Sequence, residues 1–366
     1  MSSRWTAVAE LGQSIWYDNV ARPALATGLL SKLMREDAVT GGTSNPSIFS
    51  KAVLDSDLYD EEIRAAPATD DDVTVFQRCA IADIQQACDL MRPVWDATDG
   101  ADGYISIEEE AALAFEYEPA VQRAHELRAL VDRPNVMIKI PGTDEGVKAF
   151  RRLTREGVNV NMTLLFARDR YQQIADAYVD ALTERVEAGE DVTAAASVAS
   201  FFVSRIDVQV DKRLPEGSPL LGRIAVANAK LAYADVFLPA HTGPRWERLA
   251  AAGARPQRPL WASTGAKNPN YSPTLYIDEL IGENTVTTVP DATLDAVRDS
   301  TEPAPDHATV LDGIDQARAE IDALAAAGVD LDAITAELER DGVEAFGKAY
   351  DEMLEAIAGK RARVSG

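Results

Sequence analysis

Asn135-Val136-Met137-Ile138-Lys139-Ile140-Pro141-Gly142 has the composition of a buried β-strand with a single lysine in its middle. Apolar and β-branched residues fill the run, and proline and glycine close it. Burial disfavours the charged form of an amine, and a neutral amine attacks carbonyl carbons to form a Schiff base. Lys139 is therefore a candidate nucleophile. From this stretch alone, an alternative is that the lysine reaches solvent or pairs with a carboxylate at the strand edge.

Strand-like runs recur along the chain and alternate with amphipathic helical patterns, as in residues 72–98 and 168–188. Eight strands are expected, near Ser14–Asp18, Ala38–Asn45, Gly103–Glu108, Val136–Gly142, Val158–Phe166, Ala195–Ser204, Pro259–Gly265 and Thr285–Pro290. This alternation predicts an α/β fold of the (β/α)8 type, a TIM barrel. The rival is a doubly wound open sheet, which is weakened because no Gly-x-Gly-x-x-Gly follows the first strand.

Two further helical patterns, at residues 308–326 and 330–360, follow the eighth strand. We expect these additional C-terminal helices to pack outside the barrel or to form a subunit contact, so the chain is either a monomer or a homodimer. No low-complexity linker or internal repeat divides the sequence. Residues 1–366 are therefore expected to form a single domain.

The composition sets limits on the partners of this chain. It is 46% hydrophobic and 26% charged, as in ordinary globular proteins, and its formal net charge is −24. This charge argues against nucleic acid and anionic membranes as main partners. Cys79 and Cys88 lie nine residues apart in one predicted helix and are not expected to form a disulfide, and the three histidines have no metal-ligand spacing. We expect no metal site, no membrane span and a cytoplasmic location.

Polar side chains interrupt the apolar runs at the same end of successive strands. In parallel barrels the chemistry gathers at the C-terminal ends of the strands. The polar residues at that end are Asp18, Asn45, Glu108, Lys139, Asn161, Thr163, Ser200, Arg205, Ser263 and Lys267. Taken singly, each has a structural explanation; Asn45, for example, precedes Pro46 and could begin a helix. Taken together, they favour one shared site.

These residue types suit Schiff-base chemistry on a phosphorylated sugar. The carboxylates, Asp18 and Glu108, could move protons during dehydration of the carbinolamine and during cleavage of a carbon–carbon bond. The amides and hydroxyls of Asn45, Asn161, Thr163 and Ser200 could hold a polyol. Arg205, and Lys267 with Ser263, could bind a phosphate.

The sequence resembles the transaldolase family over about residues 12–360. The resemblance lies in five motifs: Ser14-Ile-Trp-Tyr-Asp18, Thr43-Ser-Asn-Pro-Ser-Ile-Phe49, Val136-Met-Ile-Lys-Ile-Pro-Gly-Thr143, Asn159-Val-Asn-Met-Thr-Leu-Leu-Phe166 and Ser200-Phe-Phe-Val-Ser-Arg-Ile206. It implies a barrel enzyme of the pentose phosphate pathway without metal or organic cofactor. Such an enzyme transfers a dihydroxyacetone unit from sedoheptulose 7-phosphate to glyceraldehyde 3-phosphate, giving erythrose 4-phosphate and fructose 6-phosphate.

The resemblance also implies a role for each matching residue. Lys139 matches the Schiff-base lysine, and Asp18 matches the acid/base at the donor hydroxyl. Glu108 and Thr163 match the pair that holds a catalytic water. The residues that orient the dihydroxyacetone moiety are matched by Asn45, Asn161 and Ser200, and a phosphate ligand is matched by Arg205.

The sequence departs from the family pattern at two places. Strand three continues as Ile105-Ser-Ile-Glu108-Glu-Glu110, and we select Glu108 because it follows Ser-Ile as the motif requires. After strand seven, many members have an arginine for the phosphate, whereas this chain has Lys267, which lacks the bidentate fork of arginine.

Two other functions remain open from the sequence. One is a related Schiff-base aldolase that acts on fructose 6-phosphate or another ketose phosphate and releases free dihydroxyacetone. The other is a non-catalytic barrel that only binds sugar phosphates. A barrel that only binds would be expected to lack at least one of Lys139, Asp18 and Glu108, and all three are present.

Overall fold

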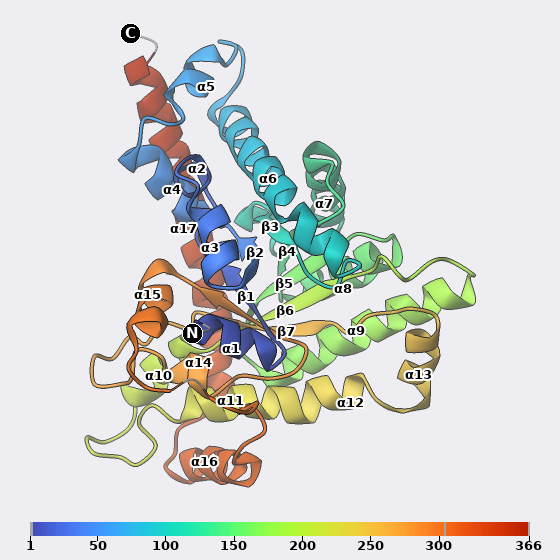
Figure 1. Cartoon of the computed structure of the whole chain (residues 1–366), viewed down its shortest axis with the longest axis vertical. Coiled ribbons are helices and arrows are strands. Elements are labelled where there is room, and N and C mark those ends of the chain that lie inside the picture. The colour runs from blue at the N-terminus through green and yellow to red at the C-terminus, as the bar shows by residue number, and fades with distance from the viewer. Residues whose placement is uncertain (1–2, 304, 365–366) are drawn as a thin grey trace.

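Eight parallel strands close into a barrel in the computed structural model, which describes residues 3–303 and 305–364 (Figure 1). The strands follow one another around the barrel in chain order. They are β1 (Gln13–Tyr17), β2 (Val39–Thr43), β3 (Ile105–Glu108), β4 (Val136–Pro141), β5 (Val160–Leu165), β6 (Ser197–Phe202), β7 (Arg258–Ala262) and β8 (Thr285–Val289). The predicted TIM barrel and all eight predicted strands are confirmed.

One helix precedes the first strand, and the others connect the strands or follow the last one. They are α1 (Arg4–Glu10), α2 (Arg22–Ala26), α3 (Leu29–Glu36), α4 (Pro46–Asp55), α5 (Asp60–Ala65), α6 (Asp72–Ala97), η1 (Ala111–Leu113), α7 (Tyr117–Val131), α8 (Asp144–Arg155), α9 (Arg168–Glu187), α10 (Ser204–Asp211), α11 (Ile224–Ala232), η2 (Tyr233–Phe237), α12 (Leu238–Ala240), α13 (Gly243–Ala251), α14 (Leu275–Asp278), α15 (Asp291–Asp299), α16 (Ile314–Ala326) and α17 (Leu331–Val364). The helices predicted at 72–98 and 168–188 correspond to α6 and α9. Both cysteines lie in α6, buried and free.

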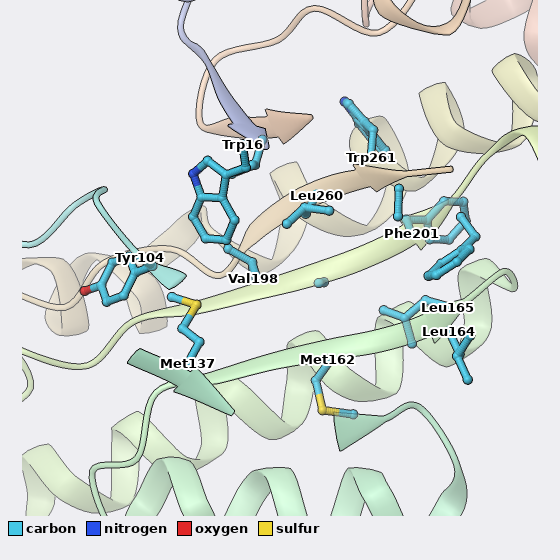
Figure 2. Close-up of a cluster of buried hydrophobic side chains, with 14 of the residues drawn as sticks. Trp16, Tyr104, Met137, Met162, Leu164, Leu165, Val198, Phe201, Leu260 and Trp261 are labelled. Carbon is cyan, nitrogen blue, oxygen red and sulfur yellow. The ribbon is translucent and has the colours of Figure 1, made fainter. Parts of the chain in front are cut away.

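The alternation of side chains along the strands separates the inside of the barrel from the layer beneath the helices. Ser200 pairs in register with Leu260 on one face, and Phe201 pairs with Trp261 on the other. The rings of Phe201 and Trp261 meet edge to face, with their centroids 6.3 Å apart. Figure 2 shows this pair at one side, and Trp16, Met137 and Val198 gathered at the other.

Trp16 explains a glycine in the neighbouring strand. A Cβ added to Gly41 would lie 2.5 Å from the indole Nε1 of Trp16, which is fully buried. Since real Cβ atoms do not approach that closely, β2 needs a residue without a side chain at this position. The indole Nε1 in turn donates a hydrogen bond to Asp102 Oδ1 at 2.8 Å. Trp16 is thus fixed both by packing and by this bond.

The two C-terminal helices have different places in the fold. Helix α16 packs against α11, on the outside of the barrel as expected. Helix α17, red in Figure 1, runs along α4 and α5 but also contacts β5. The expectation that both helices pack outside the barrel is therefore incomplete, because α17 also reaches the C-terminal end of the sheet.

Candidate active site

Lys139 and Glu108 meet inside the C-terminal half of the barrel. The strand register places Glu108 of β3 beside Lys139 of β4, and Lys139 beside Asn161 of β5. Lys139 Nζ lies 3.2 Å from Glu108 Oε2 and 3.5 Å from the carbonyl oxygen of Ser44. The Lys139 and Glu108 side chains are only 7% and 6% exposed. Pairing with a carboxylate, the alternative for Lys139, is therefore observed, and its partner is the predicted catalytic glutamate.

Burial raises the pKa of Glu108 above its usual range. The positive charge of Lys139 and its hydrogen bond act in the opposite direction, and the nearby charge of Asp18 adds to the rise. A carboxyl group with a raised pKa exchanges protons more readily near neutral pH. Glu108 is thus suited to give and take a proton at the nitrogen of Lys139.

Asp18 directly follows β1 and is partly buried at the same end of the barrel. Its Oδ1 accepts a hydrogen bond of 2.5 Å from the hydroxyl of Thr43, at the end of β2. Burial raises the pKa of Asp18, whereas the Thr43 hydrogen bond and the charges of Lys139 and Lys267 lower it. Asp18 is therefore a second carboxyl group with a raised pKa within the electrostatic reach of Lys139.

A buried chain of polar side chains crosses three strands next to Lys139. The hydroxyl of Ser200 donates to Asn161 Oδ1 at 2.6 Å, and Asn161 Nδ2 donates to Ser106 Oγ at 3.0 Å. These bonds fix which way the amide of Asn161 points. Thr163 lies two residues further along β5 and is 1% exposed, and its Oγ1 has no hydrogen-bond partner among the described residues.

Asn45 serves as a helix cap. Its Oδ1 accepts a hydrogen bond of 3.1 Å from the backbone N–H of Ile48, and Pro46 occupies the first turn of α4. The structural explanation for Asn45 is thus correct, but the cap uses only the carbonyl oxygen of the amide. The cap holds the side chain in place at the end of β2, next to the Ser44 carbonyl that faces Lys139.

Arg205 stands near the start of α10, directly after β6. In the part of the chain that the structure describes, its guanidinium has no ion pair and no hydrogen bond. It lies 5.1 Å from the centre of the Phe202 ring. Burial lowers its pKa, and no carboxylate of residues 3–303 or 305–364 counteracts this effect. Such an arginine is free to bind an anionic ligand.

Ser263 and Lys267 lie in the loop after β7. Ser263 has a positive φ of 56°, an unusual conformation for a residue other than glycine that often marks a functional site. Its Oγ lies 2.9 Å from Ser204 Oγ, so Ser263 contacts the residue that precedes Arg205. Lys267 is exposed, and its charge acts on Asp18. The structure therefore brings both predicted residues of this loop to the same end of the barrel.

The run Glu108-Glu109-Glu110 is divided among three environments. Glu108 faces Lys139, and Glu110 accepts two hydrogen bonds from Arg123, at 2.6 and 2.8 Å. Glu109 is 3% exposed, and neither of its carboxyl oxygens has a hydrogen-bond partner among the described residues. Burial, together with the charges of its two neighbours, raises its pKa well above the usual range.

Sequence reasoning gave no role to three residues of the site. Thr43 and Ser106 lie within the strand ends that were considered, and Ser106 is two residues from Glu108 and so shares its face. That spacing was a usable signal. Phe346 of α17 gave no such signal, because it is far away in the sequence, yet its ring centre lies 5.7 Å from Lys139 Nζ.

No helix in residues 3–303 and 305–364 is long and apolar enough to cross a membrane. Over the same residues, no group of three or more histidine, cysteine, aspartate or glutamate side chains is placed to hold a metal ion.

Comparison with known proteins gives one consistent result. The family model described as transaldolase/fructose-6-phosphate aldolase matches residues 15–357. A transaldolase of Frankia alni is 44% identical over 364 residues, covering 98% of this chain and 97% of that protein. A transaldolase of Thiobacillus denitrificans is 45% identical, covering 96% of this chain and 98% of that protein. A transaldolase of Mycobacterium tuberculosis is 42% identical and covers 95% of each chain. With this match along nearly its whole length, the chain belongs to the transaldolase/fructose-6-phosphate aldolase family.

Proposed function

We propose that this chain is a transaldolase that carries a dihydroxyacetone unit on Lys139. The donor is sedoheptulose 7-phosphate and the acceptor is glyceraldehyde 3-phosphate, and the products are erythrose 4-phosphate and fructose 6-phosphate, as in the pentose phosphate pathway. The observation that carries the proposal is the buried lysine, 3.2 Å from a carboxyl group with a raised pKa. A nucleophilic amine and a proton carrier within hydrogen-bond distance are what Schiff-base formation requires.

In the first half of the reaction, Lys139 Nζ attacks the ketone carbon of the donor and forms a carbinolamine. Glu108, with a water held also by the Thr163 hydroxyl, gives the proton that lets the carbinolamine lose water and become the iminium ion. Asp18 then accepts the proton of the donor hydroxyl at carbon 4, the bond between carbons 3 and 4 breaks, and the shortened aldose phosphate leaves. The dihydroxyacetone unit remains on Lys139 as an enamine.

In the second half, the enamine carbon attacks the aldehyde of the acceptor and the same steps run in reverse. The Ser200–Asn161–Ser106 chain supports a role for Asn161 and Ser200 in orienting the dihydroxyacetone hydroxyls, because each hydrogen bond restricts the direction of the next group. Asn45 would contribute the amide nitrogen that its capping bond leaves free.

The phosphate of either sugar would bind to Arg205, with Ser263 and Lys267 nearby. Among the described residues the Arg205 guanidinium has no carboxylate partner, which supports this role, since a phosphate would not have to displace an existing ion pair. Arginine matches the oxygens of a phosphate through its planar fork, and lysine adds a point charge.

The remaining parts of the proposal concern the whole chain. We infer one barrel domain over residues 1–366, working as a monomer or homodimer in the cytoplasm on sugar phosphates, without metal or organic cofactor and without nucleic acid or membrane as a partner. The packing of α17 along α4 and against β5 supports the single domain. The net charge of −24 supports small anions, bound in a local basic pocket, rather than polyanions as partners.

Borohydride trapping tests the function. The protein is incubated with fructose 6-phosphate, reduced and digested, and the added mass is located by mass spectrometry. We expect an adduct of the dihydroxyacetone unit on Lys139. Two other buried lysines, Lys230 and Lys360, serve as internal controls, because each is 6% exposed or less but has partners outside the proposed site. An adduct on a control lysine would contradict the proposal. The absence of any adduct with both fructose 6-phosphate and sedoheptulose 7-phosphate would also contradict it.

A second assay separates the transferase from the related aldolase. With fructose 6-phosphate alone, an aldolase releases free dihydroxyacetone at every turnover, whereas a transaldolase holds it on the lysine until an aldehyde arrives. Erythrose 4-phosphate is then added, and sedoheptulose 7-phosphate is measured. We expect repeated turnover to begin only when erythrose 4-phosphate is added, with sedoheptulose 7-phosphate rather than free dihydroxyacetone as the product.

A further inference from the structure

Helix α17 places an aromatic ring against the amine of Lys139. The centre of the Phe346 ring lies 5.7 Å from Lys139 Nζ. Nζ also has two polar neighbours, Glu108 Oε2 at 3.2 Å and the Ser44 carbonyl oxygen at 3.5 Å. Phe346 therefore supplies an apolar side to the surroundings of an amine whose side chain is only 7% exposed.

The position of the ring is fixed by contacts one helical turn to either side. Gly342 lies against Leu164 of β5, so closely that a Cβ on residue 342 would be 3.0 Å from a Leu164 methyl carbon. Leu164 has a positive φ of 60°, where the pairing of β5 with β6 is irregular. On the other side, Tyr350 packs edge-on against Phe76 of α6, with centroids 6.0 Å apart. The helix thus sits directly on the end of the sheet around Phe346.

Polar contacts also hold α17 toward both of its ends. Lys360, which is 3% exposed, donates to the carbonyl oxygen of Val53 at 3.1 Å, and Arg361 donates to that of Asp70 at 2.7 Å. Toward the start of the helix, Glu337 pairs with Arg213 of the loop after α10 at 2.8 Å. A helix held in this way keeps the ring over Lys139.

We propose that Phe346 screens the enamine and iminium on Lys139 from water and thereby favours transfer over hydrolysis. This inference rests on the proposed function. The enamine has two fates. Its nucleophilic carbon can form a carbon–carbon bond with the acceptor aldehyde. Alternatively, that carbon takes up a proton, water adds to the carbon–nitrogen double bond, and the carbinolamine breaks its carbon–nitrogen bond, which frees dihydroxyacetone and the lysine.

The two fates differ in which molecule must reach the intermediate, and at which carbon. Hydrolysis needs a water molecule at the carbon bonded to Nζ, whereas transfer needs the acceptor aldehyde at the next carbon. An apolar ring beside the nitrogen removes space and hydrogen-bond partners for additional water on that side. The catalytic water proposed between Glu108 and Thr163 would occupy the polar side of the site, beside the carboxyl group that exchanges protons with Nζ.

The test compares three variants of the full chain with the wild type: Phe346→Ala, Phe346→Met and Leu354→Ala. Each is supplied with fructose 6-phosphate and erythrose 4-phosphate, and the ratio of free dihydroxyacetone to sedoheptulose 7-phosphate is measured. We expect the ratio to rise about fivefold or more in Phe346→Ala, which corresponds to about 1 kcal/mol. Methionine is a large apolar side chain, so Phe346→Met is expected to stay within twofold of the wild type.

Leu354→Ala is the matched control for loosening of the helix. Leu354 is a partly buried residue that packs on the core two turns beyond Phe346, about 12 Å along the helix. In Leu354→Ala we expect the ratio of free dihydroxyacetone to sedoheptulose 7-phosphate to remain within twofold of the wild type. An unchanged ratio in Phe346→Ala, or an equal rise in either Phe346→Met or Leu354→Ala, would overturn the screening role. Failure of the wild type to form an adduct on Lys139 would instead refute the proposed function, so the two failures can be distinguished.

Discussion

Replacing Glu109 with glutamine should stabilise the folded protein, increasingly so as the pH rises. Glu109 is 3% exposed, and neither of its carboxyl oxygens has a hydrogen-bond partner in the described part of the chain. A charge in such a place is strongly disfavoured, so the folded chain keeps this carboxyl group protonated to a much higher pH than the unfolded chain does. Glutamine has nearly the same shape and does not ionise.

The sign and size of the effect follow from proton linkage. Because the pKa of Glu109 is raised on folding, its contribution to stability is fully present below the unfolded pKa of about 4.3 and is lost as the pH rises toward the folded pKa. Over that window the folded state binds up to one more proton than the unfolded state. The wild type therefore loses up to about 1.4 kcal/mol per pH unit relative to Glu109→Gln.

The assay is thermal unfolding of both proteins at pH 5, 6, 7 and 8, at one scan rate. For 366 residues, an unfolding entropy of about 2.1 cal/mol/K per residue gives about 0.77 kcal/mol/K, so 1 kcal/mol moves the Tm by about 1.3 °C. The Tm difference in favour of Glu109→Gln should therefore widen with rising pH, by up to about 1.8 °C per pH unit, until the pH passes the folded pKa.

A matched control lies one residue further along the chain. Glu110 accepts two hydrogen bonds from Arg123, so Glu110→Gln removes an ion pair and should lower the Tm. The reasoning on Glu109 would be refuted by a Tm difference from Glu109→Gln that stays constant from pH 5 to 8. It would equally be refuted by a stability gain in Glu110→Gln that matches that of Glu109→Gln.

Four further predictions concern the site and the barrel. Lys139→Ala should lower turnover by roughly a thousandfold or more, because no amine remains to form the Schiff base; substantial residual turnover in folded protein would exclude Lys139 as the nucleophile. Asp18→Asn should still form the borohydride-trapped adduct but slow donor cleavage by roughly 100-fold or more in single-turnover measurements, and an unchanged cleavage rate would remove its role. Arg205→Ala should raise KM for the phosphorylated donor by roughly 10- to 100-fold with a smaller change in kcat, and equal effects on an unphosphorylated ketose would argue against a phosphate contact. Gly41→Ala should cost about 1–3 kcal/mol through overpacking against Trp16, measured by chemical denaturation, and a neutral substitution would show that β2 can move away from the indole.

The barrel could be predicted from the sequence because its signal is repeated. Short strand-like runs recur eight times and alternate with helical patterns, which leaves few possible architectures. The site could be predicted for a related reason. Parallel strands end on the same side of the sheet, so polar residues that are distant in the sequence, such as Asp18 and Lys139, come to lie at one mouth.

What the sequence could not predict are contacts between elements that no local pattern links. The approach of Phe346 to Lys139 depends on the path of α17 over the end of β5, and that path depends on a glycine contact at Gly342 and on the unusual backbone of Leu164. A helical pattern specifies which face of a helix is apolar, but not which partner covers that face.

The three glutamates show the same limit at the scale of single residues. The three side chains differ in their contacts: Glu108 ends β3 and meets Lys139, Glu109 is buried without a hydrogen-bond partner among the described residues, and Glu110 pairs with Arg123. The motif selected Glu108, and its contact with Lys139 agrees with that choice. The burial of Glu109 could not be predicted from the sequence, since an acidic residue beside two others ordinarily indicates an exposed position.

The acidic charge of the protein makes the environment of Arg205 informative. Other arginines, such as Arg123, Arg152 and Arg170, pair with carboxylates at 2.6–2.8 Å. With a net charge of −24, a carboxylate partner is the ordinary surrounding of an arginine in this chain. Arg205 instead has an aromatic neighbour, Phe202, and no negative charge in the described part of the chain compensates its burial. Leaving a half-buried guanidinium without an anion is unfavourable for the free protein, and a bound phosphate would remove that cost. The same argument predicts that inorganic phosphate raises the Tm of the wild type more than that of Arg205→Ala, by an amount that grows with phosphate concentration.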